Sequence, residues 1–266
     1  MKTSRNVTRR DVVRIALGSA IGILATLTFA PQLQATETDA WGDLVGRFVY
    51  DGSPPERKRL EVEKDVECCG KFDIRDETLL VAPDGGLANV FVYVRSRRVD
   101  ICPELEQSVD EKVVLDNRDC IFQPHCMTIW YPEQDFEIIN SDPVGQNVAF
   151  TPVFDTPVNV VLPVGGKTIH HFSRTQTVPV KIVCNYHPWE SGYVLPRDNP
   201  YAAVSAADGS FRIPKLPIGE LEFQVWHERV GFVTTSAWSR GRFKITIRPG
   251  LNDLGTIELS PALFGR

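Results

Sequence analysis

Cys184 and His187 stand three residues apart, in the segment Cys-Asn-Tyr-His-Pro-Trp-Glu that ends at Glu190. A valine-rich stretch of strand character precedes this segment, which we therefore expect to form a tight loop. A thiolate and an imidazole on one tight loop can hold a single soft or borderline metal ion from one side. The segment therefore predicts part of a mononuclear metal site, whose remaining ligands must come from elsewhere in the chain.

A second motif lies upstream of this loop. Phe122-Gln123-Pro124 leads into a strand, and the segment Ile-Asn-Ser-Asp-Pro-Val-Gly-Gln-Asn-Val follows at 139–148. Together with the Cys184 loop, these segments resemble the copper-binding regions of cupredoxins. Such proteins commonly run from an F-x-P strand to an N-x-D-x-x-x-H-N-V segment, and amicyanin closes its site with a short C-x-x-H-x-x-M loop. The resemblance covers about residues 112–197.

The resemblance implies a copper site in which Cys184 and His187 match the family pattern. Gln146 stands where cupredoxins have their first histidine ligand, and Glu190 stands where they have the axial methionine. A Cys, His and Glu set favours copper(II) over copper(I) and a lower reduction potential. Zinc is the alternative metal, because it accepts Cys, His and Glu in a tetrahedral site with water as fourth ligand.

Other residues could compensate for the two replaced ligands. His125 is a weaker candidate, because the cupredoxin pattern places it on a strand away from the loops. His170 and His171 point to opposite faces of one strand, so at most one could reach the site. His227 is interpreted as structural, and Cys126 is either a further ligand or, as we favour, a buried thiol. The alternative for the whole site is a cupredoxin-like fold that binds no metal.

The elements that must position these residues are strands. Helical periodicity is almost absent, and strand-like alternation recurs between turn signals. Eight short strands are expected over 112–197, the size of a Greek-key sandwich. The fold class predicted is all-β, and the best candidate for a short helix is the segment at 104–111.

Residues outside 112–197 resemble a second kind of β-sandwich, the transthyretin-like, or carboxypeptidase-regulatory-like, domain. The hairpin Ala-Asp-Gly-Ser-Phe-Arg-Ile at 207–213, followed by the strand at 221–227, matches its T-D-x-D-G-x-F-x-I pattern. The usual opening of that domain appears far upstream, at 46–55. We therefore expect one sandwich that is split in sequence around the cupredoxin-like part, the alternative being consecutive domains. The expected divisions are 1–35, 36–111, 112–197 and 198–266.

The combined pattern over about 41–262 resembles exported cupredoxin-like proteins that are called methylamine-utilisation proteins. These pair a C-N-x-H-x-W-M-x-G-Y loop with a later V-W-H strand, which is present here as Val225-Trp226-His227. Glu190 in place of the methionine is again the exception. The family name establishes no substrate.

The first 35 residues have the features of an export signal. Arg9 and Arg10 precede an apolar run at 15–30, as in a twin-arginine signal peptide. Cleavage would leave no membrane span and an extracytoplasmic or periplasmic protein, and the alternative is that the segment stays as an uncleaved N-terminal anchor. Because this segment carries a net charge of +4 within a total of −5, the remainder carries −9. That acidic balance argues against nucleic acid as a partner.

Export permits disulfides, and six cysteines are present. If Cys184 binds metal, five remain, so at least one thiol stays unpaired. Cys68 and Cys69 are adjacent and cannot easily serve the same partner. We expect one of them to be bonded to Cys120.

Two functions follow from these patterns. The first is a copper-binding or electron-transfer protein with a redox partner protein. The second is a metal-free scaffold that binds protein or glycan. An enzyme is not expected, because no Ser-His-Asp order, P-loop or dinucleotide fingerprint is present.

Overall fold

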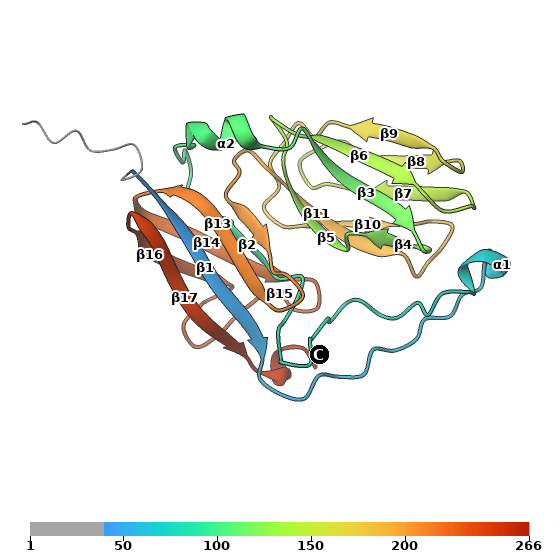
Figure 1. Ribbon diagram of the computed structural model, residues 1–266, viewed down its shortest axis with the longest axis horizontal. Coiled ribbons are helices and arrows are strands. Elements are labelled where there is room, and N and C mark those ends of the chain that lie inside the picture. The colour runs from blue at the N-terminus through green and yellow to red at the C-terminus, as the bar shows by residue number, and fades with distance from the viewer. Residues whose placement is uncertain (1–39, 266) are drawn as a thin grey trace, which may run out of the picture. The chain divides into compact units, whose positions relative to one another are not determined.

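The computed structural model describes residues 40–265, and the expected export signal at 1–35 lies outside them. Regular structure in the described part is nearly all strand, as predicted (Figure 1). Its helices are short, namely α1 (Val66–Cys69), α2 (Pro103–Ser108) and the 3-10 helix η2 (Pro261–Leu263). None of the helices in this part of the chain is long and apolar enough to cross a membrane.

The central sandwich, residues 112–197, packs two sheets face to face. One sheet has the strand order β4-β3-β6-β9, and the other has the order β5-β11-β10-β7-β8. The chain crosses repeatedly between the two sheets, and the pairs β3–β6 and β11–β5 are parallel. This arrangement agrees with the Greek-key sandwich expected from the sequence. The strands are β3 (Lys112–Arg118), β4 (Ile121–Gln123), β5 (Cys126–Trp130), β6 (Asp135–Asn140), β7 (Gln146–Phe150), β8 (Val158–Leu162), β9 (Lys167–His170), β10 (Val180–Val183) and β11 (Ser191–Arg197).

Alternation of side chains along these strands builds the core of the central sandwich. In β6 every second residue is buried, so Phe136 and Ile138 face the opposite sheet. Ile182 and Val194 meet them from the other sheet, and Cys184 belongs to the same buried cluster. The thiol of the predicted site is therefore attached to the core of the sandwich.

The second sandwich is built from both ends of the described chain. Strand β1 lies between β13, to which it is antiparallel, and β17, to which it is parallel. The facing sheet has the order β12-β2-β14-β15, with β16 also paired to β14. Residues 41–94 and 202–259 thus form one sandwich into which the central sandwich is inserted. Its strands are β1 (Trp41–Tyr50), β2 (Phe91–Val94), β12 (Ala202–Val204), β13 (Ser210–Pro217), β14 (Gly219–His227), β15 (Gly231–Phe232), β16 (Arg242–Ile247) and β17 (Gly250–Leu259).

Residues 51–80 leave the second sandwich and reach the central one; we call this segment the strap (Figure 1). The strap folds back on itself through the bridge between Arg59 and Arg75. Its far end is α1, where Cys69 forms a disulfide with Cys120 in the turn between β3 and β4. The expected bond from one of the adjacent cysteines to Cys120 is confirmed.

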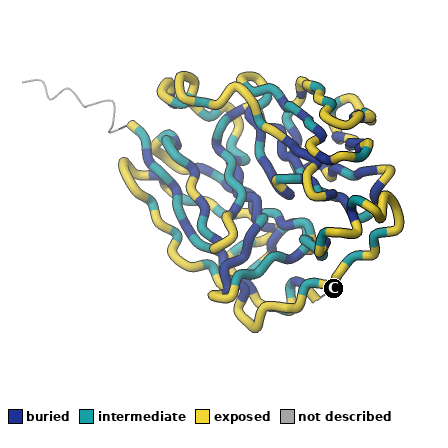
Figure 2. The backbone as a smooth tube through the Cα atoms, turned by 45° about the vertical axis from the view of Figure 1, so that its right-hand side comes forward, coloured by how far each residue is buried: buried dark blue, intermediate teal, exposed yellow. Residues whose placement is uncertain are grey.

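Direct contacts join the two sandwiches. Phe91 and Tyr93 of β2 pack in one buried cluster with Cys126 and Leu195 of the central sandwich. Arg197 donates from Nη2 to the carbonyl of Val94 at 2.7 Å. Figure 2 shows dark, buried backbone running through both parts of the described chain. The two sandwiches are therefore held together by packing as well as by the strap.

The disulfide closes a sequence separation of 51 residues. Replacing Cys69 and Cys120 by Ser should lower the free energy of unfolding by about 4 kcal/mol, because the unfolded chain regains the entropy of that loop. Urea unfolding followed by circular dichroism would measure the change. Cys68→Ser is the matched control and should leave the stability near its original value. Equal losses in both variants would contradict the pairing.

Candidate metal centre

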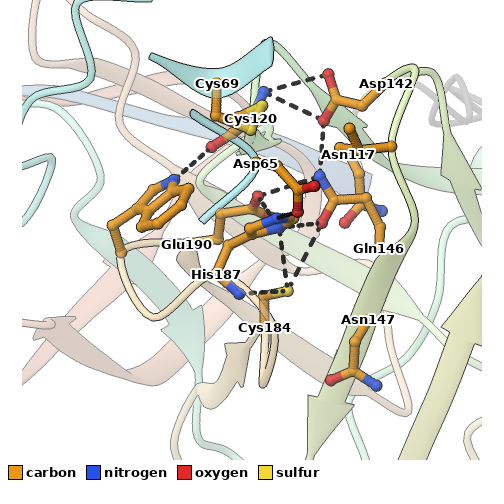
Figure 3. Close-up of polar contacts among 12 residues, drawn as sticks. Asp65, Cys69, Asn117, Cys120, Asp142, Gln146, Asn147, Cys184, His187 and Glu190 are labelled. Carbon is orange, nitrogen blue, oxygen red and sulfur yellow. Dashed lines mark hydrogen bonds and ion pairs between the residues drawn. A yellow bond between two sulfur atoms is a disulfide. The ribbon is translucent and has the colours of Figure 1, made fainter. Parts of the chain in front are cut away.

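Four polar side chains converge at one end of the central sandwich (Figure 3). Gln146 opens β7, whereas Cys184, His187 and Glu190 lie on the loop between β10 and β11. The exposed fractions are 0% for Gln146 and His187, 3% for Cys184 and 1% for Glu190. The structure thus brings together all four residues that the sequence proposed as principal ligands.

The donor atoms of these side chains surround Nδ1 of His187. This nitrogen lies 3.7 Å from Sγ of Cys184, 2.8 Å from Oε1 of Gln146 and 3.1 Å from Oε1 of Glu190. The Cys184 Sγ and the Gln146 Oε1 are 3.6 Å apart. Ligand atoms at about 2.0–2.3 Å from one tetrahedral ion lie about 3.3–3.8 Å from each other. The observed spacing therefore requires only small side-chain shifts to hold a metal ion.

Backbone hydrogen bonds make the loop tight. The amide of Glu190 donates to the carbonyl of His187 at 2.9 Å, and the amide of His187 donates to Cys184 Sγ at 3.3 Å. The amide of Asn185 donates to Oδ1 of Asn147, the second residue of β7. These bonds fix the loop to the strand that carries Gln146, so the four donors face each other.

Asp142 orients the amide of Gln146. The Gln146 Nε2 donates to Asp142 Oδ2 at 2.8 Å and to Glu190 Oε1 at 3.2 Å. Asp142 itself accepts from the backbone amide of Cys120. With both amide hydrogens directed in this way, the Oε1 of Gln146 is left facing Cys184 and His187.

The strap covers His187 from the other side. Oδ2 of Asp65, the residue before α1, lies 2.8 Å from Nε2 of His187 (Figure 3). The indole of Trp189 lies 5.0 Å from the imidazole, centroid to centroid, and donates from Nε1 to the carbonyl of Cys120. A proton on Nε2 that is directed at Asp65 leaves Nδ1 as the ligand atom.

Electrostatics favour a positive charge at this position. Burial lowers the pKa of His187, but bonds to Cys184, Glu190 and Asp65 outweigh it and raise the pKa to about 10. Burial raises the pKa of Glu190 despite its bond to His187. The cluster therefore attracts a cation, which a proton or a metal ion can supply.

One atom of the cluster remains unsatisfied. The Oε2 of Glu190 is buried and has no hydrogen-bond partner among the described residues. A buried carboxylate oxygen without a partner is costly, and a metal ion would relieve that cost. The residues present thus fit a metal ion with sulfur, nitrogen and oxygen ligands.

The structure separates the other candidate residues from this site. His125 contacts Glu228 and Glu77 instead, and its neighbour Cys126 lies beside them. His170 packs between the rings of Phe150 and Phe172, whereas His171 is exposed and pairs with Asp135 at 2.9 Å. His227 packs against Phe264 in the second sandwich. None of these histidines therefore takes the place of the ligands that Gln146 and Glu190 replace.

Sequence reasoning missed Asp65. It lies in a segment rich in charged residues, and its side chain is 45% accessible. The only local signal was its position shortly before Cys68-Cys69, one of which was expected to bond to Cys120. The disulfide and the contact with His187 together show that the strap belongs to the site.

Comparisons with known proteins give partial structural likenesses. No protein-family model matches the chain, and a search of curated proteins finds no match. A purple cupredoxin from Nitrosopumilus maritimus is 21% identical, with a TM-score of 0.26, over 33% of this chain and 100% of its own. An amicyanin mutant in the Cu(I) state is 14% identical, with a TM-score of 0.28, over 40% of this chain and 98% of its own.

A copper-containing nitrite reductase from Thermus scotoductus is 17% identical, with a TM-score of 0.30, over 37% of this chain. The match covers 27% of that enzyme's chain. These structural neighbours are cupredoxins or contain a comparable part. Because the identities and TM-scores are this low, the function is inferred from the geometry of the site and not from these neighbours.

Asp65→Ala should weaken binding of Cu²⁺ or Zn²⁺ by about 10–100-fold, because a carboxylate bonded to a ligand histidine orients the ring and strengthens its donor atom. Competition titration with a chromophoric chelator would measure the affinity. Glu67→Ala, an exposed residue in the strap, is the control and should bind as the original chain does. Unchanged affinity in Asp65→Ala would show that the strap only covers the site.

Proposed function

We propose that this protein binds a single copper ion and exchanges electrons with a partner protein in an extracytoplasmic compartment. The observation that carries the proposal is the convergence of one sulfur, one imidazole nitrogen and two oxygens within one buried cluster. Cys184 and His187 would supply the sulfur and nitrogen, and Glu190 and Gln146 the oxygens. When bound, copper would supply reversible one-electron chemistry.

The ligand set favours the oxidised metal. Carboxylate and amide oxygens are harder ligands than the thioether and second imidazole of a blue-copper site, so they stabilise copper(II) and lower the potential. The carboxylate of Glu190 also carries the negative charge that balances the cation. Zinc remains the alternative occupant, because it accepts the same sulfur, nitrogen and oxygen donors.

Access for a partner is restricted. His187 is fully buried beneath Asp65 and Trp189, whereas Tyr186 in the same loop is 38% exposed. Asn185 and Pro188 are exposed on either side. A redox partner would therefore approach the site over this outer part of the loop.

A metal-free scaffold is the competing function. The observation in its favour is that Gln146, His187 and Glu190 already bond to one another without a metal ion, although Oε2 of Glu190 has no partner among the described residues. Measurement of metal content and of visible absorption separates the two functions.

The copper-loaded chain should absorb strongly in the visible region, and Cys184→Ser should abolish that absorption, because it arises from thiolate-to-copper charge transfer. Absorption spectroscopy after stoichiometric copper addition would measure the loss. Cys102→Ser, which removes a buried thiol elsewhere, should keep the colour. A strong thiolate band that persists in Cys184→Ser would rule out this ligand.

Glu190→Met should raise the reduction potential, because a thioether stabilises copper(I) better than a carboxylate. Adding Gln146→His should shift the spectrum further toward that of a blue site. Protein-film voltammetry and absorption spectra of the single and double variants would test both effects. If the double variant also binds no copper, the metal-free scaffold becomes the better description.

A further inference from the structure

A second buried cluster lies where three parts of the chain meet. His125, just before β5 of the central sandwich, directs Nε2 at Oε1 of Glu228, just after β14, at 2.5 Å. Its Nδ1 lies 3.6 Å from Oε2 of Glu77 in the strap. Cys126 is adjacent, and one ligand atom each of His125, Cys126 and Glu228 lie within 4.8 Å of one another.

These groups are withdrawn from water. The exposed fraction is 7% for His125 and for Cys126, and the side chains of Glu228 and Glu77 are 4% and 23% accessible. None of them belongs to the cluster around His187. The proposed function therefore gives them no role.

Hydrogen bonding leaves this cluster incomplete. The Nδ1 of His125 is buried and has no hydrogen-bond partner among the described residues, because Glu77 stops short of bonding distance. Cys126 forms no disulfide. An unpartnered polar atom in a buried site calls for a ligand or a structural explanation.

Charge also favours a cation in this cluster. Two carboxylates face one imidazole, so the three groups carry a net negative charge even when His125 is protonated. Arg57 also lies near Glu77 and reduces this negative charge, but its guanidinium donates its hydrogen bonds to the carbonyls of Asp76 and Arg75 and to neither carboxylate of the cluster. Buried carboxylates that lack a full set of cationic partners favour a divalent cation.

We propose that His125, Cys126 and Glu228 form a second metal site that suits zinc, with Glu77 beside the other ring nitrogen of His125. Imidazole nitrogen, thiolate sulfur and carboxylate oxygen are the donors of tetrahedral zinc sites. A divalent ion would replace the proton between Nε2 of His125 and Glu228, and Nδ1 would then be free to donate toward Glu77. The proposal is independent of whether copper binds at Cys184.

Such an ion would join the three parts of the chain. Its ligands would come from the start of β5 and from the end of β14, and Glu77 of the strap would contact the other nitrogen of the ligand His125. It would therefore fix the strap at its base, while the disulfide of Cys69 fixes it at its tip. Because the site exists only in the folded chain, bound zinc would raise the stability of the fold by mass action.

Co²⁺ is the probe of choice, because it takes zinc sites and absorbs visibly when a thiolate coordinates it. The full chain with Cys184→Ser lacks the thiolate of the first centre, so any thiolate-to-cobalt absorption must come from another cysteine. We expect one equivalent of Co²⁺ to give this absorption and Zn²⁺ to displace it. Adding Cys126→Ser should abolish the absorption, whereas adding Cys102→Ser should not.

Thermal unfolding gives a second readout. Excess Zn²⁺ should raise the Tm of the Cys184→Ser chain, and the rise should disappear when Glu228→Gln is added. Absence of thiolate absorption in Cys184→Ser would overturn the proposal. So would absorption that survives Cys126→Ser, or an equal zinc-induced rise in Tm with and without Glu228→Gln.

Discussion

Burial of the His187 imidazole is the constraint on which the rest of the site depends. The ring is fully buried, so both of its nitrogens need partners, and neither can take them from solvent. Nε2 takes Asp65 from the strap, and Nδ1 takes Gln146 and Glu190 from the central sandwich. The loop, strand β7 and the strap are therefore arranged around the imidazole of His187. This arrangement leaves Nδ1 as the ring atom that can bind a metal ion.

The inserted topology makes that arrangement possible. Because β1 and β2 belong to the second sandwich, the chain between them is free to extend toward the central one as the strap. Ordering a connection of this length costs conformational entropy. The disulfide from Cys69 to Cys120 offsets part of that cost, because it also restricts the unfolded chain. The strap thus gives the second sandwich a physical connection to the candidate metal centre.

The two polar clusters, one at the tip of the strap and one at its base, are built from the same kinds of residue. At each end a histidine of the central sandwich meets a strap carboxylate, which is Asp65 in one case and Glu77 in the other. In each case a cysteine and a glutamate complete the buried group. Charged groups that are removed from water in this way are stable only when they are paired, and a metal ion pairs several of them at once.

The sequence by itself determined the fold class, offered the split sandwich as one of two alternatives, and named the four residues Gln146, Cys184, His187 and Glu190 that meet in the candidate metal centre. Those inferences rest on local patterns, namely alternation along strands, turn residues, and the loop from Cys184 to Glu190. It also limited the disulfide to Cys120 and one of two adjacent cysteines. The choice of Cys69, the contact of Asp65 with His187 and the grouping of His125 with Glu228 were decided only by tertiary structure. Each joins residues far apart in the chain, and no local pattern records which distant carboxylate will meet a buried imidazole, because that depends on how the strap and the two sandwiches pack.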